Sequence, residues 1–316
     1  MTLDNILEEI KKADTILILS HENPDGDAIG SGLAMMWALK NMEKNVDLVI
    51  KEYPENFKFL PGTEFIKNKP DDKEYDLAIA VDCADIKRIN SIYVEDFENA
   101  KVKIQFDHHT KNSMFADYNF VNPVSPACCQ ILATVFDYIK VEKTKDITTC
   151  LLTGIITDTG GFRNTNITTD TFEFASFALL KGINVSKLYN QVLMVKTKEK
   201  FEAEKIAMQR MEFFGDGKIS FTYITNKDKE EIKTNIGDLD GIVEIGKNIE
   251  GVEVSIFIYE REEDFKISLR SKDYVDVSEI CMLFGGGGHI RAAGCNMATT
   301  LEDAKNKIVN ETLKNI

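Results

Sequence analysis

Histidines and aspartates that could bind a metal ion stand in a few short stretches of the first half of the chain. His21, Asp25 and Asp27 fall within seven residues, in a turn that also contains Pro24 and Gly26. Such mixed nitrogen and oxygen ligands suit Mn²⁺ and related first-row ions. A turn can direct side chains this closely spaced into one small volume, so the stretch is a candidate metal site. The alternative is an ordinary polar turn in which Asp27 caps the helix that follows.

Three later stretches carry the same residue types: Asp82, the run Asp107-His108-His109, and Asp158. Together with the first turn they supply four carboxylates and two imidazoles, namely His21, Asp25, Asp27, Asp82, His108 and Asp158. Two divalent ions would balance the four carboxylates and leave a site that accepts an anionic phosphate. Two-metal sites of this kind share a carboxylate and activate water for displacement at phosphorus. Asp82, alone at its strand end, is the expected bridge.

The elements that position these residues are those of an α/β protein. Apolar runs at 15–19, 77–81 and 102–106 predict buried strands of a parallel sheet. His21, Asp82 and Asp107 each follow one of these runs, and the carboxyl ends of parallel strands meet at one sheet edge. The separate stretches should therefore converge on one site. Other expected elements here are helices at 1–14, 33–39, 127–139, 147–157 and 168–180, a strand at 46–50, and a surface loop at 53–75.

The pattern changes in the second half, which we expect to form a smaller mixed α/β domain. The predicted domains are residues 1–185 and 201–316, joined by a polar linker at 186–200, with the active site in the cleft between them. The expected elements of the second domain are a charged helix at 200–214, strands at 219–224, 252–259 and 265–271, and helices at 242–247, 277–283 and 301–313.

Composition narrows the possible partners. The net charge of the 316 residues is −14, and both halves are acidic, so the basic surface needed to grip long nucleic acid is not expected. No apolar run approaches the roughly 20 residues of a membrane span, and the first residues do not resemble a signal peptide. The cytoplasm is therefore expected. The six cysteines contain no CxxC pair, and Cys128, Cys129 and Cys150 are expected as buried thiols.

Four motifs between residues 21 and 162 resemble the ordered motifs of the DHH phosphoesterase superfamily: HENPDGDAIGS, VDCAD, DHH and TDTGGF. The resemblance implies two metal sites that share Asp82. One would use His21, Asp25 and Asp82, and the other would use Asp27, Asp82, His108 and Asp158. It also implies that His109 acts on the scissile phosphate as a catalytic group, and that Asp107 orients the histidine pair.

Two residues near these motifs keep alternative roles. Arg88 follows Asp85 in the pattern D-x-x-R, so it could bind phosphate or pair with Asp85. Ser31 could contact phosphate, or it could be an ordinary residue of the first helical turn.

The second half contains a further stretch of interest, Gly285-Gly286-Gly287-Gly288-His289. Consecutive glycines allow close backbone approach, so amide groups can converge on an anion. The stretch, with the strand 266–271, resembles the DHH-associated C-terminal domain. The substrate-binding residues implied there are Arg270, Ser271, Gly286, Gly287, Gly288 and His289. The alternative is a flexible hairpin or linker.

The combined prediction is a metal-dependent phosphoesterase with two divalent ions, expected to be Mn²⁺. Its substrates would be short oligoribonucleotides, nucleoside 3′,5′-bisphosphate, or both, and a homodimer stays open. The first alternative is a cyclic or linear dinucleotide phosphodiesterase. A non-catalytic nucleotide sensor on the same fold is an alternative from another class. The lysine-rich S-R-K-K element of family II pyrophosphatases and the additional domains of RecJ-type exonucleases are not found.

Overall fold

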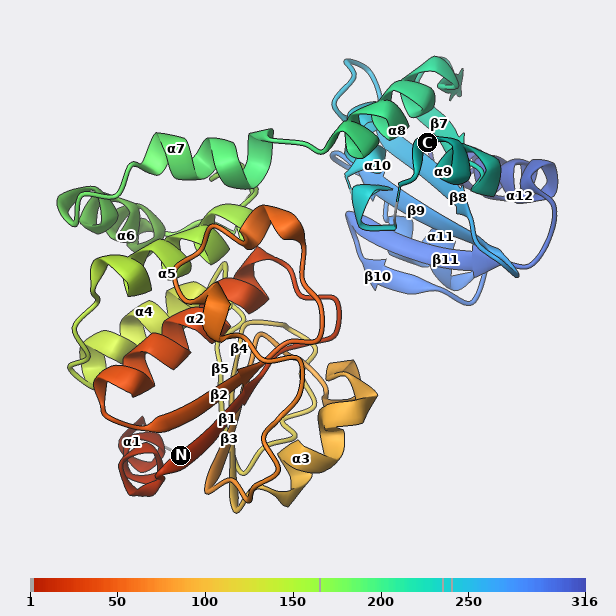
Figure 1. Ribbon diagram of the computed structural model, residues 1–316. Helices are drawn as coiled ribbons and strands as arrows, with labels where there is room; N and C mark the ends of the chain where they lie inside the picture. Colours follow the sequence, from red (N-terminus) through yellow and green to blue (C-terminus); the bar gives the residue numbers. More distant parts are fainter. Residues whose placement is uncertain (1–2, 165, 235, 240) are drawn as a thin grey trace. The chain divides into compact units, whose positions relative to one another are not determined.

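A five-stranded parallel sheet forms the centre of the first part of the chain (Figure 1). The computed structural model describes residues 3–164, 166–234, 236–239 and 241–316. The strand order is β2-β1-β3-β4-β5, with β1 at Thr15–Leu19, β2 at Asn45–Val49, β3 at Leu77–Val81, β4 at Val102–Asp107 and β5 at Tyr118–Val121. Every residue of β3 is buried. This is typical of a parallel sheet covered on both faces, as the continuous apolar run predicted.

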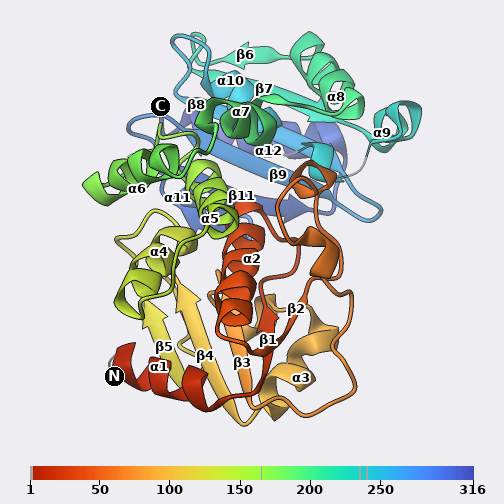
Figure 2. The same cartoon turned by 60° about the vertical axis from the view of Figure 1, so that its left-hand side comes forward.

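Helices cover both faces of this sheet (Figure 2). Ile16 and Ile18 of β1 pack with α2, α4 and α5, whereas Leu17 and Leu19 pack on the opposite face with residues of α3. This alternation follows from the two-residue period of a strand. The helices of this unit are α1 (Leu3–Lys12), α2 (Gly26–Asn41), α3 (Val94–Asn99), α4 (Cys128–Tyr138), α5 (Lys145–Asp158), α6 (Thr169–Leu180) and α7 (Val185–Tyr189).

A six-stranded mixed sheet forms the second part, in the order β10-β11-β9-β8-β7-β6. Its strands are β6 (Glu212–Phe214), β7 (Ile219–Ile224), β8 (Val254–Glu260), β9 (Phe265–Ser271), β10 (Gly287–His289) and β11 (Ala292–Met297). The pair β7 and β8 is parallel, and the other neighbours are antiparallel. The helices here are α8 (Lys198–Gln209), α9 (Asn226–Ile232), α10 (Ile242–Lys247), α11 (Val277–Met282) and α12 (Leu301–Leu313). The expected α/β class, a parallel sheet followed by a smaller mixed domain, is confirmed.

The chain separates into two compact units, Met1–Val195 and Lys196–Ile316. The segment 186–200, expected as a polar linker, is mostly helical, because α7 and a π-helical turn at Asn190–Met194 precede α8. The expected helix at 200–214 ends at Gln209, and β6 follows it. The expected loop at 53–75 contains two short 3₁₀ turns and buries Phe57 and Leu60.

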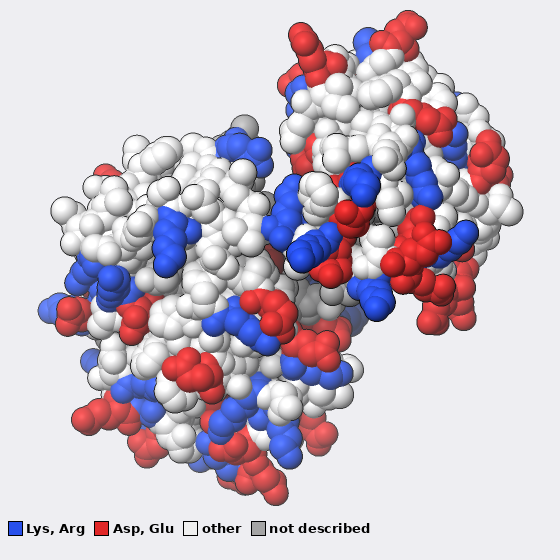
Figure 3. All heavy atoms as spheres, turned by 45° about the horizontal axis from the view of Figure 1, so that its top comes forward, with Lys and Arg blue, Asp and Glu red and all other residues white. Residues whose placement is uncertain are grey.

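The surface charge, the apolar character of the helices and the state of the cysteines agree with what the composition predicted. On the face of each unit that Figure 3 displays, acidic and basic side chains are intermingled and form no broad basic area. None of the described helices combines the length and apolar character that crossing a bilayer requires. All six cysteines are buried free thiols, including Cys128, Cys129 and Cys150.

Candidate active site

The strand ends bring the predicted ligands of the first unit together. His21 lies just beyond β1 and Asp82 just beyond β3, and His21 Nε2 is 3.6 Å from Asp82 Oδ2. The other ring nitrogen, Nδ1, is 2.8 Å from the carbonyl oxygen of Glu22, which fixes the plane of the imidazole. His21, Asp25 and Asp82 each offer a ligand atom, and these atoms lie within 4.8 Å of one another. This group matches the first predicted metal site.

A second group forms around His108, just after β4. Its Nε2 is 3.2 Å from Asp158 Oδ2, 3.4 Å from Asp82 Oδ1 and 3.9 Å from Asp27 Oδ2. Asp27, His108 and Asp158 offer ligand atoms within 4.8 Å of one another. Asp82 contacts both groups through different oxygens, as a bridging carboxylate must. All six predicted ligands therefore lie together.

Two helices hold Asp27 in place. Its carboxylate accepts backbone hydrogen bonds from Cys128 at 2.6 Å and from Cys129 at 2.9 Å, the first two residues of α4. The amides at a helix N-terminus carry partial positive charge, so α4 fixes the direction of this fully buried carboxylate. The cap of α2 is Asp25, whose Oδ1 accepts from the Asp27 and Ala28 amides. The alternative in which Asp27 caps that helix is therefore wrong.

Glycines allow α2 and α5 to approach closely. A Cβ atom on Gly26 would lie 2.4 Å from Thr157 Cγ2, and one on Gly30 would lie 2.5 Å from the Cys150 carbonyl oxygen. On α5, a Cβ at Gly154 would lie 2.5 Å from Asp27 Oδ1. This tight packing brings Asp27 near the start of α2 beside Asp158 at the end of α5.

His109 is oriented separately from His108. Asp107 Oδ1 is 2.8 Å from His109 Nδ1, and Asp107 Oδ2 accepts from the His109 amide and from Asn112 Nδ2. The Nδ1 atom of His108 instead lies 3.3 Å from the Ser125 carbonyl oxygen. Asp107 thus orients His109 alone rather than the histidine pair.

The structure decides between the alternative roles that the sequence left open for Arg88 and for Ser31. Arg88 Nη1 lies 3.4 Å from His109 Nε2, whereas Asp85 uses its carboxylate to cap the 3₁₀ turn Ile86–Arg88. Arg88 therefore stands beside His109 and not in an ion pair with Asp85. Ser31 is fully buried and donates to the Ala28 carbonyl, so it is a helix residue.

The second unit places Arg270 and His289 on one face of its sheet. Arg270 of β9 is paired with Ala292 of β11, which is paired with His289 of β10. Residues directly opposite in neighbouring antiparallel strands point to the same face. Arg270 Nε donates to Glu244 Oε1 of α10 at 3.0 Å, and His289 is exposed. Ser271 is buried on the opposite face, so the structure does not group it with these two.

The glycine run forms a hairpin rather than an open anion loop. Residues 287–289 are an edge strand paired with β11, and the Gly286 amide donates to the Cys281 carbonyl. A Cβ on Gly286 would lie 2.2 Å from the Gly294 carbonyl oxygen, so packing explains that glycine. Gly287 differs, because a Cβ there would meet nothing within 4 Å. The space beside Gly287 is therefore open. It adjoins the outer side of β10, an edge strand, where backbone groups are not used by a further strand of this sheet.

Comparison with known proteins agrees with this geometry. Residues 15–155 match the model of the DHH family N-terminal domain, and residues 216–315 match that of the DHHA1 domain. A Thermus thermophilus protein, the bifunctional oligoribonuclease and PAP phosphatase NrnA, is 33% identical over 296 residues, which are 92% of this chain and 87% of that protein. The chain belongs to the DHH family. It is a phosphoesterase, as the four motifs predicted.

Solved structures share the fold of this DHH protein. An exopolyphosphatase-related protein from Bacteroides fragilis superposes with a TM-score of 0.90 at 26% identity, covering 99% of this chain and 95% of that one. RecJ from Thermus thermophilus, in complex with Mn²⁺, gives a TM-score of 0.58 at 13% identity, covering 99% of this chain and 54% of that one. The second likeness concerns the fold alone.

The residues of the DHH domain fit divalent ions. Asp82 Oδ1 is buried and accepts no hydrogen bond from the described residues, which is costly for a carboxylate oxygen unless a cation binds it. Burial raises the pKa of Asp158 to about 6, despite the contact with His108, and repulsion from Asp82 adds to the rise. Burial, with Asp82 and Asp158 nearby, also raises the pKa of Asp27. A bound cation would relieve this crowding of carboxylates.

The histidines respond to the same carboxylates. Burial alone would lower the pKa of His108, but contacts with Asp158 and Asp82 outweigh burial and raise it to about 12. Burial likewise opposes ionisation of Asp82, yet its contacts with His108 and His21 hold its pKa below the usual range. A histidine side chain must be neutral to bind a metal ion. A cation at this site would therefore take the place of a proton on these imidazoles.

Sequence analysis missed several supporting residues. Asn112 could have been suspected, because an amide five residues after Asp107 can reach back across a turn. The Ser125 carbonyl and the α4 amides could not have been suspected, because such backbone groups do not depend on the residue type and leave no pattern in the sequence. Glu244, which contacts Arg270, lies 26 residues before it and carries no local signal.

Proposed function

We propose that this protein hydrolyses phosphate esters of small nucleotides, with short oligoribonucleotides and nucleoside 3′,5′-bisphosphates as substrates. The observation that carries the proposal is the position of Asp82, which contacts both ligand groups and has one buried oxygen that accepts no hydrogen bond from any residue that the structure describes. His21 and Asp25 would complete one metal site, and Asp27, His108 and Asp158 the other. Two divalent ions, with Mn²⁺ expected, would activate water and stabilise the attacking and leaving oxygens.

His109 and its neighbours supply the remaining chemistry. Arg88 can only donate, so His109 Nε2 accepts in the pair and Nδ1–H donates to Asp107. When Nε2 is also protonated, the Asp107 carboxylate stabilises the imidazolium and keeps it oriented. His109 can then deliver the Nε2 proton to the leaving oxygen. The guanidinium of Arg88, 3.4 Å away, adds positive charge for a phosphate oxygen.

The second unit would hold the rest of the substrate. We assign this role to Arg270, His289 and the open backbone at Gly287, which share the edge of the sheet formed by β9, β11 and β10. Gly286, Gly288 and Ser271 would shape this edge rather than touch the substrate, because Gly286 and Gly288 pack against β11 and Ser271 is buried. The expected cleft between the two units, a homodimer and a cytoplasmic location stay predictions.

Short substrates are favoured by charge. The chain carries a net charge of −14, so a long polyanion is repelled wherever it extends past the site. The few phosphate contacts available also imply a shallow dependence of affinity on salt, since each neutralised phosphate of a single strand contributes a log–log slope of only about −0.7.

Two alternative functions differ in substrate or in class. A cyclic or linear dinucleotide phosphodiesterase would use the same metal site. A nucleotide sensor without catalysis is disfavoured, because every predicted ligand is present and converges on Asp82.

A substrate series tests the proposal. Initial rates would be measured with Mn²⁺ and with chelator on 5′-labelled RNAs of increasing length, on nucleoside 3′,5′-bisphosphate and on a cyclic dinucleotide, at two salt concentrations. We expect metal-dependent cleavage that is fastest for RNAs of a few nucleotides and for the bisphosphate. Equal or faster cleavage of long RNA, with a steep salt dependence, would instead indicate a processive exonuclease.

A further inference from the structure

A small pocket adjoins the metal ligand His21. Its volume is about 110 Å³, and its walls include His21, Glu22, Lys51, Glu52 and Asn90. Since a water molecule occupies roughly 30 Å³ of liquid, the space equals about three or four waters. This is room for a small polar group, such as the hydroxyl-bearing edge of a sugar, beside the scissile phosphate.

Glu22 is the polar group that this pocket holds most firmly. The side-chain amide of Asn90, itself 8% exposed, donates to Glu22 Oε1 at 3.0 Å. The Glu22 backbone amide donates to the Arg88 carbonyl at 2.6 Å, and His21 forms a β-bridge with Ile89. An exposed glutamate is ordinarily free to rotate, and a buried amide that fixes one oxygen removes that freedom. The other oxygen, Oε2, makes no hydrogen bond within the described part of the chain and is presented to solvent.

The chemistry of the pocket selects the group that it binds. An ionised carboxylate only accepts hydrogen bonds, so it repels phosphate and attracts hydroxyl groups. Two carboxylates, Glu22 and Glu52, line the pocket with one lysine, Lys51, so acidic side chains outnumber basic ones and disfavour a second phosphate. A ribonucleotide whose phosphate lies at His21 and Asp82 brings a sugar hydroxyl only a few bonds away.

We propose that Glu22, held by Asn90, accepts a hydrogen bond from the ribose 2′-hydroxyl next to the scissile phosphate and makes the enzyme select ribonucleotides over deoxyribonucleotides. This inference rests on the proposed function, because it needs a nucleotide at the metal site. A site that accepts a hydrogen bond from a substrate hydroxyl group discriminates against the analogue without that hydroxyl. The acceptor of the site is then buried without a hydrogen-bond partner.

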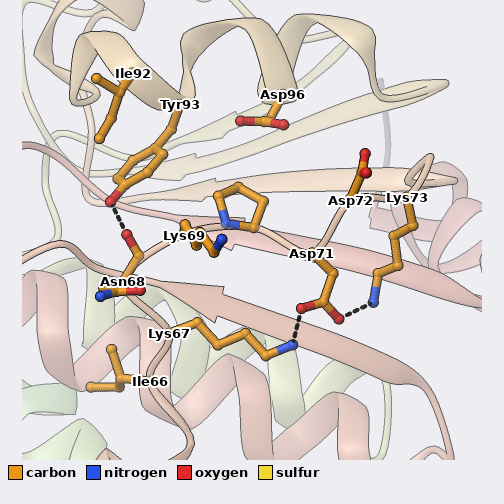
Figure 4. Close-up of a pocket in the computed structure, with 11 residues that line it drawn as sticks. Ile66, Lys67, Asn68, Lys69, Asp71, Asp72, Lys73, Ile92, Tyr93 and Asp96 are labelled. Carbon is orange, nitrogen blue, oxygen red and sulfur yellow. Dashed lines mark hydrogen bonds and ion pairs between the residues drawn. The ribbon is translucent and has the colours of Figure 1, made fainter.

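A larger hollow nearby does not compete for this role. It has a volume of about 940 Å³ and is lined by residues 66–73 with Ile92, Tyr93 and Asp96 (Figure 4). Lys67 and Lys73 both pair with Asp71 and with the buried Asp47. None of the predicted metal ligands lines it. Lys67 and Lys73 are thus engaged in internal ion pairs that support the sheet.

The test compares matched ribo- and deoxyribodinucleotides. We expect the wild-type protein to prefer the ribodinucleotide in kcat/KM. Glu22→Ala should lower that preference about 10- to 100-fold, the range expected when a hydrogen bond to a charged acceptor is lost. Bound metal should stay at the wild-type level, because Glu22 belongs to neither of the two ligand groups. Glu52→Ala is the matched control, since it removes the same charge from the same pocket and should change both substrates by one common factor.

Binding of adenosine 3′-monophosphate and 2′-deoxyadenosine 3′-monophosphate to the metal-loaded protein, measured by calorimetry, separates this inference from the proposed function. Tighter binding of the ribonucleotide that Glu22→Ala abolishes supports the inference even if neither dinucleotide is cleaved, a result that would reject only the proposed function. An unchanged ribo-to-deoxyribo ratio in Glu22→Ala, or the same loss of preference in Glu52→Ala, would overturn the role of Glu22.

Discussion

Gly154 offers the sharpest test of how the fold positions the metal ligands. It lies on α5, and a Cβ atom there would be 2.3 Å from Cys129 Sγ and 2.5 Å from Asp27 Oδ1. Favourable contacts between non-bonded heavy atoms need roughly 3.5 Å, so Gly154→Ala must displace the Asp27 carboxylate by about 1 Å. Both neighbours are fully buried and have little room to move.

The expected effect on activity exceeds the effect on stability. Overpacking costs about 1–3 kcal/mol, and alanine regains about 1 kcal/mol of helix propensity over glycine, which leaves roughly 0–2 kcal/mol of destabilisation. A misplacement of about 1 Å at a catalytic centre can lower the rate about 100-fold. Gly154→Ala should therefore fold, bind Mn²⁺ more weakly and lose most of its activity.

Gly32→Ala is the matched control. Gly32 lies on α2, and the nearest atoms to its added Cβ all belong to the Leu48 side chain, with Cδ1 at 3.0 Å, so this overpacking does not press on a candidate metal ligand. The assays are titration of bound Mn²⁺, initial rates on a short RNA, and the free energy of unfolding in urea. Wild-type metal affinity and rate in Gly154→Ala would refute the argument that this glycine positions Asp27.

Three further variants probe other parts of the molecule. Asp82→Ala should remove more activity than the roughly 10- to 100-fold typical of losing an outer partner of a metal ligand, and retention of most of the rate would rule out a bridging carboxylate. His289→Ala should lower kcat/KM on short RNA by about 10²–10³ with bound metal unchanged, and loss of metal instead would contradict its assigned role. Burial alone would raise the pKa of Asp47, but hydrogen bonds from Lys67, Lys73 and Tyr75 hold it at about 2, so this carboxylate stabilises the fold above its unfolded pKa near about 3.9. Asp47→Asn should thus cost about 2–3 kcal/mol at pH 7, and urea unfolding should show the difference shrinking as the pH falls towards about 2; a constant difference would contradict this.

The grouping of the candidate metal ligands could be predicted because local and global rules agree at the strand ends. Apolar runs identify β1, β3 and β4, and the shared carboxyl edge of a parallel sheet then brings His21, Asp82 and Asp107 together. The strands β5, β6, β10 and β11 were missed for the opposite reason. The three residues of β10 are Gly-Gly-His, which have no strand preference of their own, and pairing with β11 makes them a strand.

The support of the ligands was not predictable, because it comes from groups without a sequence signature. Asp27 is held by amides that follow it by more than 100 residues, and those amides are donors only because α4 begins there. The four glycines suggested an anion loop, but two of them serve a close approach of backbones within the hairpin. Residue types predict which atoms can coordinate, whereas tertiary packing decides which atoms are held still.

The position of Asp82 depends both on its residue type and on the tertiary packing around it. Its φ of +51° lies in the left-handed region, which costs a residue with a side chain about 1–3 kcal/mol. The surrounding structure holds this conformation, because the Asp82 amide donates to the Phe106 carbonyl at 2.9 Å and Gln105 Nε2 donates to the Cys83 carbonyl at 2.6 Å. Gln105 and Phe106 belong to the buried part of β4, so these two hydrogen bonds tie the turn after β3 to the neighbouring strand. These hydrogen bonds therefore hold Asp82 between His21 and His108, where its two oxygens contact the two groups of candidate ligands.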